Sequence, residues 1–324
     1  MSKSVVYVGM DVGKVELWVA MPGQRAKMFR HTGQGVRGLV RWMRGRSDGQ
    51  VVQVCMEATG IYSRRVASRL LREPEVQISI INPARIKAFR QVQSCRTKTD
   101  SVDAQVILAF AESQRPAVWQ PGSVVQGELA ALVKQADRLR RLLTQSLNRR
   151  EHADNDPRVV RRSERALQRC FQEQLVSIDQ AIEQLCEADH RLADQVALLR
   201  TIPGVAKTSA TQLLAYGGIA LQERSAKELT AHAGLAPQHH LSGTSVRGRS
   251  RLCKQGDRRL RTVLYMPTLV AVRANPILRT YYTRLVTRGK AKKLALAACM
   301  RKLLLIVRAI LRTNRPFQAN LALT

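Results

Sequence analysis

The chain has 324 residues and carries 54 Lys and Arg against 24 Asp and Glu, a formal net charge of +30. Apolar residues make up 45% of it, which excludes a disordered basic tail and allows two or three domains. Basic residues outnumber acidic ones by 19 to 9 in residues 1–115 and by 23 to 3 in residues 200–324, but the counts are 12 and 12 in residues 116–199. Two basic lobes around a neutral middle indicate nucleic acid as the partner of the lobes and protein as the partner of the middle.

The first 115 residues alternate between strand and helix patterns. Apolar runs predict strands at 4–10, 15–20, 27–31, 51–56 and 76–81, and helical spacing predicts helices at 35–44, 61–71, 83–90 and 100–113. This order, βββαβαβα, predicts an α/β layer fold resembling ribonuclease H. A Rossmann fold is less favoured because no G-x-G-x-x-G motif follows the first strand.

Four acidic residues stand at the ends of these elements. Asp11 and Glu57 each end a strand, while Asp100 and Asp103 lie three residues apart on one face at the start of a helix. Any one of them alone could be a solvated strand end or a first-turn acid favoured by the helix dipole. Together they predict a site for Mg²⁺, two ions in all, because carboxylate oxygens are its preferred ligands and paired ions can clamp a reacting phosphodiester.

Residues 116–199 are helical in pattern, with a narrow apolar stripe that steps by three and four residues. The stripe comprises Leu129, Leu132, Ala136, Leu139 and Leu143, then Leu175, Ile178, Ile182, Leu185, Asp189, Leu192, Val196 and Leu199. Asp189 is the acid among these positions, and a buried acid there could fix register at a cost in stability. We expect an antiparallel or intermolecular coiled coil; the alternative is two helices packed on their own domain.

The basic C-terminal region begins with a helix, a Pro203-Gly204 turn and a second helix at 200–217. This pattern predicts a helix-hairpin-helix element that binds phosphate through backbone N–H groups, with Lys207 adding charge. A plain helical corner is the alternative. A capping box from Ser225 to Glu228 starts a further helix, and three more are expected at 257–274, 277–288 and 290–313.

A loop rich in Gly, Ser and Arg is expected at 234–256. Ser242 beside Gly243 is a plausible nucleophile on phosphorus, and nearby cations could neutralise a phosphorane. The cations are Arg247, Arg249, Arg251 and Lys254. The alternative is a flexible loop that only grips phosphates, and His239 and His240 are either proton shuttles or surface residues.

These motifs, in this order, resemble the DEDD transposases of insertion-sequence family 110, which include the Piv-type DNA invertases. The resemblance covers nearly the whole chain. Its further motifs are Asn82-Pro-Ala84, Lys98-Thr-Asp-Ser-Val-Asp-Ala104, Ile202-Pro-Gly204, Ala233-Gly-Leu-Ala-Pro237, Ser242-Gly-Thr-Ser-Val-Arg-Gly248 and Lys254-Gln-Gly-Asp-Arg-Arg-Leu-Arg261.

The resemblance implies a RuvC-like domain at 1–115 that holds the acidic tetrad, a helical oligomerisation region at 116–199, and a transposase domain at 200–324 with Ser242 as catalytic serine. It implies an RNA-guided recombinase that joins strands through a covalent serine–DNA intermediate. A non-coding bridge RNA would pair with donor and target DNA. Homodimers would assemble to tetramers, with carboxylates of one subunit near the serine of another.

The working hypothesis is that metal ions on the tetrad activate Ser242 and stabilise the leaving 3′-oxygen; Ser245 is the alternative nucleophile. Two other classes remain open. One is a RuvC-like nuclease or junction resolvase that uses water, and the other is a basic nucleic-acid-binding protein without enzymatic activity.

The expected location is the bacterial cytoplasm, in association with the nucleoid. No cysteine pair or Cys/His cluster has zinc spacing, which is typical of reduced thiols. The sequence shows no signal-peptide pattern at its start. The apolar stretch 294–311 is interrupted by Arg301, Lys302 and Arg308, which argues against a membrane span.

Overall fold

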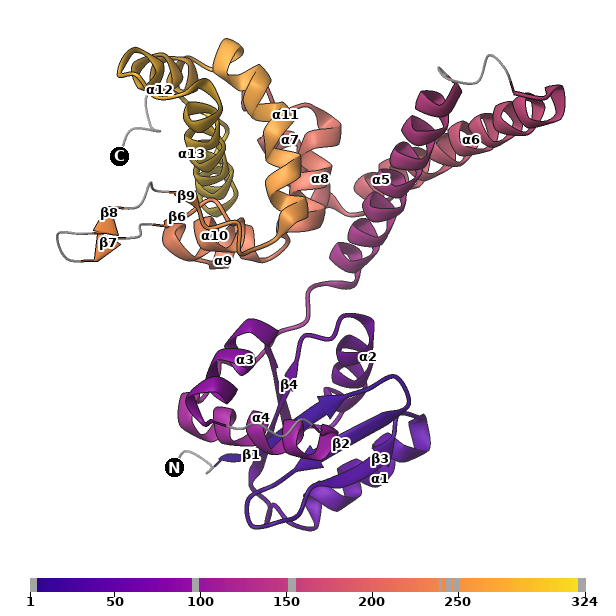
Figure 1. The fold of residues 1–324 in the computed structure, drawn as a ribbon, viewed down its shortest axis with the longest axis vertical. Coiled ribbons are helices and arrows are strands. Elements are labelled where there is room, and N and C mark those ends of the chain that lie inside the picture. Colours follow the sequence, from indigo (N-terminus) through magenta and orange to yellow (C-terminus); the bar gives the residue numbers. More distant parts are fainter. Residues whose placement is uncertain are drawn as a thin grey trace. The chain divides into compact units, whose positions relative to one another are not determined.

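The computed structural model describes residues 5–94, 99–150, 156–238, 241–242, 246–247 and 251–319. The chain divides into two compact units, Met1–Pro121 and Gly122–Thr324 (Figure 1). Among the described helices, none combines the length and the apolar character that crossing a membrane requires.

The first unit is built on a mixed five-stranded sheet. Its strands are β1 (Val5–Val12), β2 (Glu16–Ala20), β3 (Lys27–Arg30), β4 (Val51–Glu57) and β5 (Val76–Ile81). The order is β3-β2-β1-β4-β5, with β1, β2 and β3 antiparallel and β4 and β5 parallel to β1. The near-continuous apolar runs of β1 and β4 agree with burial on both faces. The predicted α/β layer fold of the ribonuclease H and RuvC type is confirmed.

Helices cover both faces of this sheet (Figure 1). They are α1 (Gly33–Arg44), α2 (Ile61–Leu70), α3 (Pro83–Val92) and α4 (Asp100–Gln114). Alternate residues of β1 and β4, such as Met10 and Met56, pack with α1 and α2. The intervening residues, such as Cys55, belong to a second cluster with α3 and α4. This period of two decides which side chains of each strand face α4.

One glycine allows α4 to lie directly on β1. A Cβ at Gly9 would stand 2.2 Å from the backbone oxygen of Ala104 and 2.3 Å from the backbone nitrogen of Leu108. Any larger side chain at this position would push the helix away from the sheet. The start of α4 is therefore positioned by a backbone-to-backbone contact near the end of β1.

The second unit begins with a long helical hairpin of α5 (Val124–Arg150) and α6 (Arg158–Ala188) (Figure 1). The two helices run antiparallel, because Ser146 near the end of α5 donates to Glu164 early in α6, and Arg140 pairs with Asp179 further along. We call this pair the helical hairpin. Whether its packing is that of a coiled coil stays a prediction.

The helical hairpin is tied to the rest of the unit near the middle of α5. Asp137 of α5 accepts a hydrogen bond of 2.5 Å from the Tyr216 hydroxyl and one of 2.9 Å from the Gln212 amide. Burial, followed by the contact with Asp137, raises the pKa of the Tyr216 hydroxyl, so it remains a donor at neutral pH. The orientation of α5 is thus tied to α8 (Lys207–Gly217) by partly buried polar contacts.

The expected apolar stripe is interrupted at Asp189, which is not a buried acid within a helical seam as the spacing suggested. The helix α6 ends at Ala188 and α7 (His190–Arg200) begins at His190. The Asp189 carboxylate accepts a hydrogen bond of 2.7 Å from the backbone N–H of Leu192, so it caps α7. An Asp favours this capping role over a buried helical position because it satisfies a free N–H group.

The remaining helices share one core with the helical hairpin. They are α8, α9 (Ala220–Glu223), α10 (Ala226–His232), α11 (Arg258–Ala274), α12 (Pro276–Thr287) and α13 (Lys292–Thr313). The predicted capping box at Ser225 and Glu228 is confirmed. The expected boundary at residue 199 lies inside this unit, and the division of the chain into three functional domains stays a prediction.

The contact at Gly9 gives a prediction for stability. Substitution Gly9→Ala should lower the free energy of unfolding of the first unit by about 1–3 kcal/mol, because the added methyl group overlaps the α4 backbone. All three tryptophans, Trp18, Trp42 and Trp119, lie in this unit, so urea unfolding followed by tryptophan fluorescence reports on it alone.

The matched control is Gly38→Ala in the middle of α1, where an added Cβ meets nothing within 4 Å. This change should stabilise the unit by about 0.5–1 kcal/mol, because Ala is the better helix former. Equal effects of the two substitutions would contradict the importance of the Gly9 contact.

Candidate functional site

Asp11 and Glu57 lie on neighbouring parallel strands and on the same face of the sheet. Met10 of β1 is in register with Met56 of β4, so Asp11 and Glu57 each follow a paired residue. Adjacent strands are about 4.8 Å apart. Because Met10 and Met56 face α1 and α2, the next residue of each strand faces α4. Both acids are half-buried.

The first turn of α4 carries Asp100 and Asp103. Thr99 caps this helix, with its hydroxyl accepting from the backbone N–H of Val102 at 3.4 Å. Asp100 is exposed and Asp103 is half-buried. The close contact of α4 with Gly9, two residues before Asp11, brings this turn toward the end of β1.

The electrostatics of Asp11 show that three of the four acids share one environment. Burial raises the pKa of the Asp11 carboxyl most, and the negative charges of Asp103 and Asp100 raise it further. The backbone N–H of Val12 and the guanidinium of Arg90 act in the opposite direction. A net upward shift means that the fold holds Asp11 against repulsion from its neighbours.

Arg90 is a functional candidate that the sequence analysis missed. It lies in the last turn of α3 and forms an ion pair with Asp103, with both side chains about one-fifth exposed. In the sequence Arg90 is one of many arginines and stands thirteen residues from its partner Asp103. No motif spacing therefore links the two residues. Only the packing of α3 beside α4 brings the two charges together.

The carboxylates fit a hard divalent cation in their chemistry, although they are not assembled as a ligand set. Among the described residues, no three His, Cys, Asp or Glu side chains are arranged to hold a metal ion. Arg90 engages Asp103 in this arrangement. The Thr59 hydroxyl, two residues after Glu57, is buried and has no hydrogen-bond partner among the described residues, so a polar ligand beside it would satisfy this group. The Mg²⁺ ligand roles of Asp11, Glu57, Asp100 and Asp103 stay predictions.

The second candidate centre is the segment around Ser242, which is not simply a loop as expected. Two short strand pairs form there: β6 (Pro237–Gln238) with β9 (Arg251–Leu252), and β7 (Leu241–Ser242) with β8 (Val246–Arg247). Ser242 is in antiparallel register with Val246. We call residues 237–252 the serine arm.

Several predicted residues of the serine arm lie outside the part of the chain that the structure describes. These are His239, His240, Ser245 and Arg249. For Ser242, Arg247 and Arg251 the backbone is placed, and their proposed side-chain roles stay predictions. Lys254, beyond the arm, is exposed and has a left-handed backbone, with φ of 54°.

The two ends of the serine arm are held together by backbone contacts. A Cβ at Gly256 would stand 2.4 Å from the carbonyl oxygen of His232, and Asp257 donates to that same oxygen at 2.6 Å. Gly234 has φ of +65°, and Arg261 donates to the carbonyl of Ala233 at 3.1 Å. These contacts explain why glycines flank the segment and fix where the arm leaves the helical core.

Lys207 was expected to bind phosphate and instead contacts a carboxylate. It begins α8 after the Pro-Gly turn, and its ammonium group pairs with Glu183 of α6. A Cβ at Gly204 would stand 2.7 Å from the Cα of Ala271, so the turn itself packs tightly against α11. Phosphate binding by this turn stays a prediction, and the packing favours the alternative of a helical corner.

Comparisons with known proteins agree over both units. Residues 196–283 match the profile described as the transposase IS116/IS110/IS902 family, and residues 8–153 match the DEDD transposase profile of IS110. The pilin gene-inverting proteins of Moraxella bovis and Moraxella lacunata are each 32% identical over 325 residues, which covers 97% of this chain and 98% of theirs. An uncharacterised protein of insertion element IS110 from Streptomyces coelicolor is 32% identical over 149 residues, 46% of this chain and 36% of its own length.

The raised pKa of Asp11 predicts a pH-dependent stability. Because the folded state holds the proton of Asp11 more tightly than the unfolded state, ionisation of this carboxyl destabilises the fold above its ordinary pKa of 3.8. Asp11→Asn should therefore be more stable than the wild type at pH 7.5, and the difference should shrink as the pH falls toward that value. Tryptophan-monitored urea unfolding at several pH values measures it.

Glu112→Gln, on the exposed end of the same helix α4, is the matched control and should change stability little at any pH. Adding Mg²⁺ should stabilise the wild type more than Asp11→Asn, because the variant loses one charged ligand. A lower stability of Asp11→Asn at pH 7.5 would show that the carboxylate is a structural partner rather than a strained member of an acidic site.

Proposed function

Because this chain belongs to the IS110 family of transposases, we propose that it is an RNA-guided DNA recombinase of a mobile element that cuts and rejoins DNA through a covalent bond to Ser242. The main support for this proposal is that one chain combines two features. It has an acidic site on a ribonuclease H-like sheet, and it has a serine on the arginine-rich serine arm, whose two ends are held together. The full-length similarity to pilin gene-inverting proteins supports rejoining as well as cutting.

In the proposed reaction the Ser242 hydroxyl oxygen attacks a DNA phosphorus and the bond to the 3′-oxygen breaks. The serine proton is lost and the 3′-oxygen gains one, so a phosphoserine and a free 3′-hydroxyl result. The phosphoserine keeps the energy of the phosphodiester, and attack by a 3′-hydroxyl restores a DNA strand and the free serine. No external energy source is needed for this exchange.

The tetrad residues Asp11, Glu57, Asp100 and Asp103 are proposed to hold Mg²⁺, two ions per site. The bound ions would supply Lewis-acid stabilisation of the attacking and leaving oxygens. Arg90 holds the Asp103 carboxylate through an ion pair, and the charges of both residues act on Asp11.

Positive side chains of the second unit are proposed to bind the substrate phosphates. Those on or beside the serine arm are Arg247, Arg249, Arg251 and Lys254, with Lys207 as a further candidate. Cations near a phosphorane stabilise the charge that develops in the transition state. Donor DNA, target DNA and a bridge RNA are the proposed partners, and guide pairing would supply the sequence specificity, as base pairing does in other guided systems.

The helical hairpin supports a proposed assembly of dimers into tetramers. Several apolar side chains on α6 are exposed, including Val159, Leu167 and Val176 at 78%, 45% and 58%. These residues are spread along α6, so they give the helix apolar surface at several points where a second subunit could pack. A serine of one subunit would then work with the carboxylates of another.

The serine mechanism predicts an adduct that survives denaturation. Wild-type protein incubated with Mg²⁺, labelled DNA and guide RNA should give a protein–DNA band on a denaturing gel. Ser242→Ala should remove this band, because the nucleophilic oxygen is gone, while Ser245→Ala should retain it. Asp11→Asn should lower its yield by at least about tenfold.

Three outcomes would count against the mechanism. An adduct in Ser242→Ala would assign the nucleophile to Ser245 or to another group. Cleavage without any adduct would favour the water-dependent nuclease. Unchanged activity in both Ser242→Ala and Asp11→Asn would favour a nucleic-acid-binding protein without catalysis.

Guidance by RNA predicts a defined companion. Protein purified from its native host at moderate salt should retain one small RNA of uniform length, because a guide binds through many phosphate contacts. Sequencing the nucleic acid that co-purifies measures this. A random mixture of cellular RNA would contradict the guided mechanism and leave the recombinase assignment standing.

A further inference from the structure

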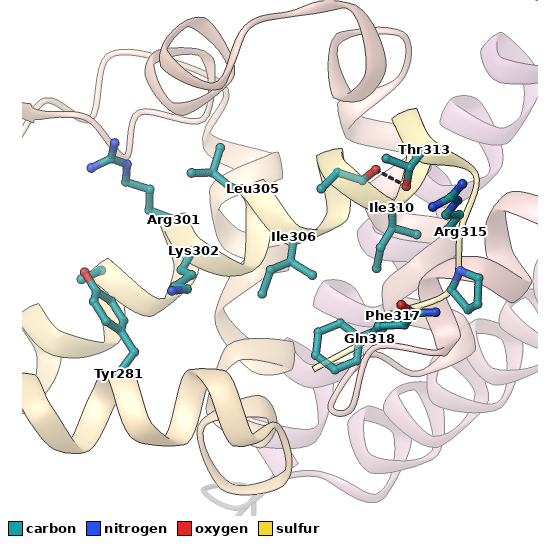
Figure 2. Close-up of a pocket in the computed structure, with 13 residues that line it drawn as sticks. Tyr281, Arg301, Lys302, Leu305, Ile306, Ile310, Thr313, Arg315, Phe317 and Gln318 are labelled. Carbon is teal, nitrogen blue, oxygen red and sulfur yellow. Dashed lines mark hydrogen bonds between the residues drawn. The ribbon is translucent and has the colours of Figure 1, made fainter. Parts of the chain in front are cut away.

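A cavity of about 660 Å³ opens in the second unit, on the side of α13 that faces Tyr281 of α12 and the tail at 315–318. Figure 2 shows apolar side chains such as Ile306 and Ile310 in this cavity, with Arg301, Lys302 and Arg315 around it. Phe317 partly lines it and is anchored, because its backbone N–H donates to the Thr201 hydroxyl at 2.8 Å. The cavity is therefore apolar inside and basic at its rim.

Two smaller hollows continue this cavity across α12. The first, of about 260 Å³, shares Tyr281 and Lys302 with the cavity. The second, of about 490 Å³, shares Thr280 and Arg284 with the first, and every residue that lines it is Arg or Thr. We call the three together the α12–α13 track.

In the part of the chain that the structure describes, no acidic side chain pairs with the cations of this track. Residues 276–319 contain eleven Lys and Arg and no Asp or Glu. Arg284, Arg288 and Arg301 are exposed, and among the described residues no carboxylate lies within ion-pair distance of them. Arg284 and Lys302 instead lie beside the Tyr281 ring, 5.3 and 5.2 Å from its centroid. A row of cations without acidic partners along a groove favours a polyanion with regularly spaced charges.

The residues that line the α12–α13 track indicate which kind of polyanion fits it. An acidic amphipathic helix needs an apolar surface along its whole length, whereas the part of the track on α12 is lined by Arg and Thr alone. A duplex keeps its bases stacked inside, whereas the cavity offers an apolar space with Tyr281 and Phe317 for an unstacked base. The lining thus fits a single strand.

The threonines favour RNA over DNA. The hydroxyls of Thr280 and Thr287 each donate at 2.9 Å to a carbonyl of their own helix, Pro276 and Thr283 respectively. Because the proton of each hydroxyl is already donated within the helix, each oxygen can only accept a hydrogen bond from a ligand. Phosphate oxygens cannot donate to it, whereas a ribose 2′-hydroxyl can.

We propose that the α12–α13 track binds a single-stranded segment of RNA, with phosphates on Arg284, Arg288 and Arg301 and one base in the cavity beside Tyr281. The inference rests on the proposed function only in that nucleic acid is the partner. It adds a site separate from the serine arm and from the acidic tetrad.

The charge part of the proposal is tested with the full-length protein and labelled 20-mers of U, of dT and of duplex DNA. Binding is measured by fluorescence anisotropy between about 50 and 200 mM salt. The variant R284Q/R288Q/R301Q should flatten the salt dependence of oligo(U) binding by about 2 in the log–log slope, because each lost phosphate contact on a single strand removes about 0.7. Arg279 is left unchanged because its guanidinium donates to the carbonyl of Arg273.

The matched control removes the same charge elsewhere. The variant R161Q/R162Q/R165Q lies on exposed positions of α6 and should bind oligo(U) like the wild type. Equal losses in the two triple variants would mean that only net charge matters and would overturn the site. Tighter binding of duplex DNA or of oligo(dT) than of oligo(U), or equal competition by polyglutamate, would overturn the RNA assignment.

The base pocket is tested by filling it. Ala309 is exposed and lines the cavity, so Ala309→Trp should fill it without a change of charge. Oligo(U) binding should weaken about tenfold, the size of one lost base contact, with an unchanged salt slope. Ala166→Trp, on an exposed position of α6, is the control and should bind like the wild type.

Wild-type affinity in Ala309→Trp would show that no base enters the cavity. The adduct test of Ser242 and this binding test measure different events. The covalent mechanism can therefore fail while the track binds RNA, and the track can fail while the adduct forms.

Discussion

The contact between α4 and β1 at Gly9 is the constraint on which the acidic site depends. A backbone oxygen and a backbone nitrogen of α4 occupy the space that a Cβ would take. Because helices normally pack on sheets through side chains, this contact brings α4 unusually close to β1. The closeness carries the first turn of α4 to Asp11, and without it Asp100 and Asp103 would belong to an ordinary surface helix.

The acidic site also lowers the stability of the fold. Burial raises the pKa of the Asp11 carboxyl most, and the negative charges of Asp103 and Asp100 raise it further, so ionising this carboxyl costs stability. Arg90 relieves part of this cost through its ion pair with Asp103. Sites built for function commonly retain such unfavourable charge, since optimal stability would replace the acids with neutral residues. The large cores on both faces of the sheet supply the stability that tolerates it.

Periodicity was sufficient to predict most elements, and with them the strand ends and the helix start that carry the four acids. It failed where the decisive interaction is local capping or tertiary packing. Asp189 fitted the apolar stripe in spacing but caps a new helix. Ser242 was expected in a loop because two-residue strands are too short to show a period. Arg90 could not be found since its role arises only when α3 and α4 are packed together.

The pairing of β1 with β4, which brings Asp11 and Glu57 side by side, followed from fold class rather than from any single motif.

The helical hairpin has a consequence for distance. At 1.5 Å per residue, the 27 residues of α5 span about 40 Å and the 31 residues of α6 about 46 Å. Contacts with the helical core extend as far as Asp137, at the middle of α5, so the part of α5 beyond it spans about 20 Å, and Val159 and Leu167 stand outside that core. The length of the helical hairpin therefore sets the distance between the helical core and any surface that binds near the tip of the hairpin. One residue added to each helix lengthens the pair by about 1.5 Å but also turns its tip by about 100°, so insertions that keep α5 packed on α6 come in steps of about one helical turn, 5.4 Å. Spacing between partners can thus change in steps much smaller than one helical turn of DNA, about 34 Å, without any change in the chemistry at either end.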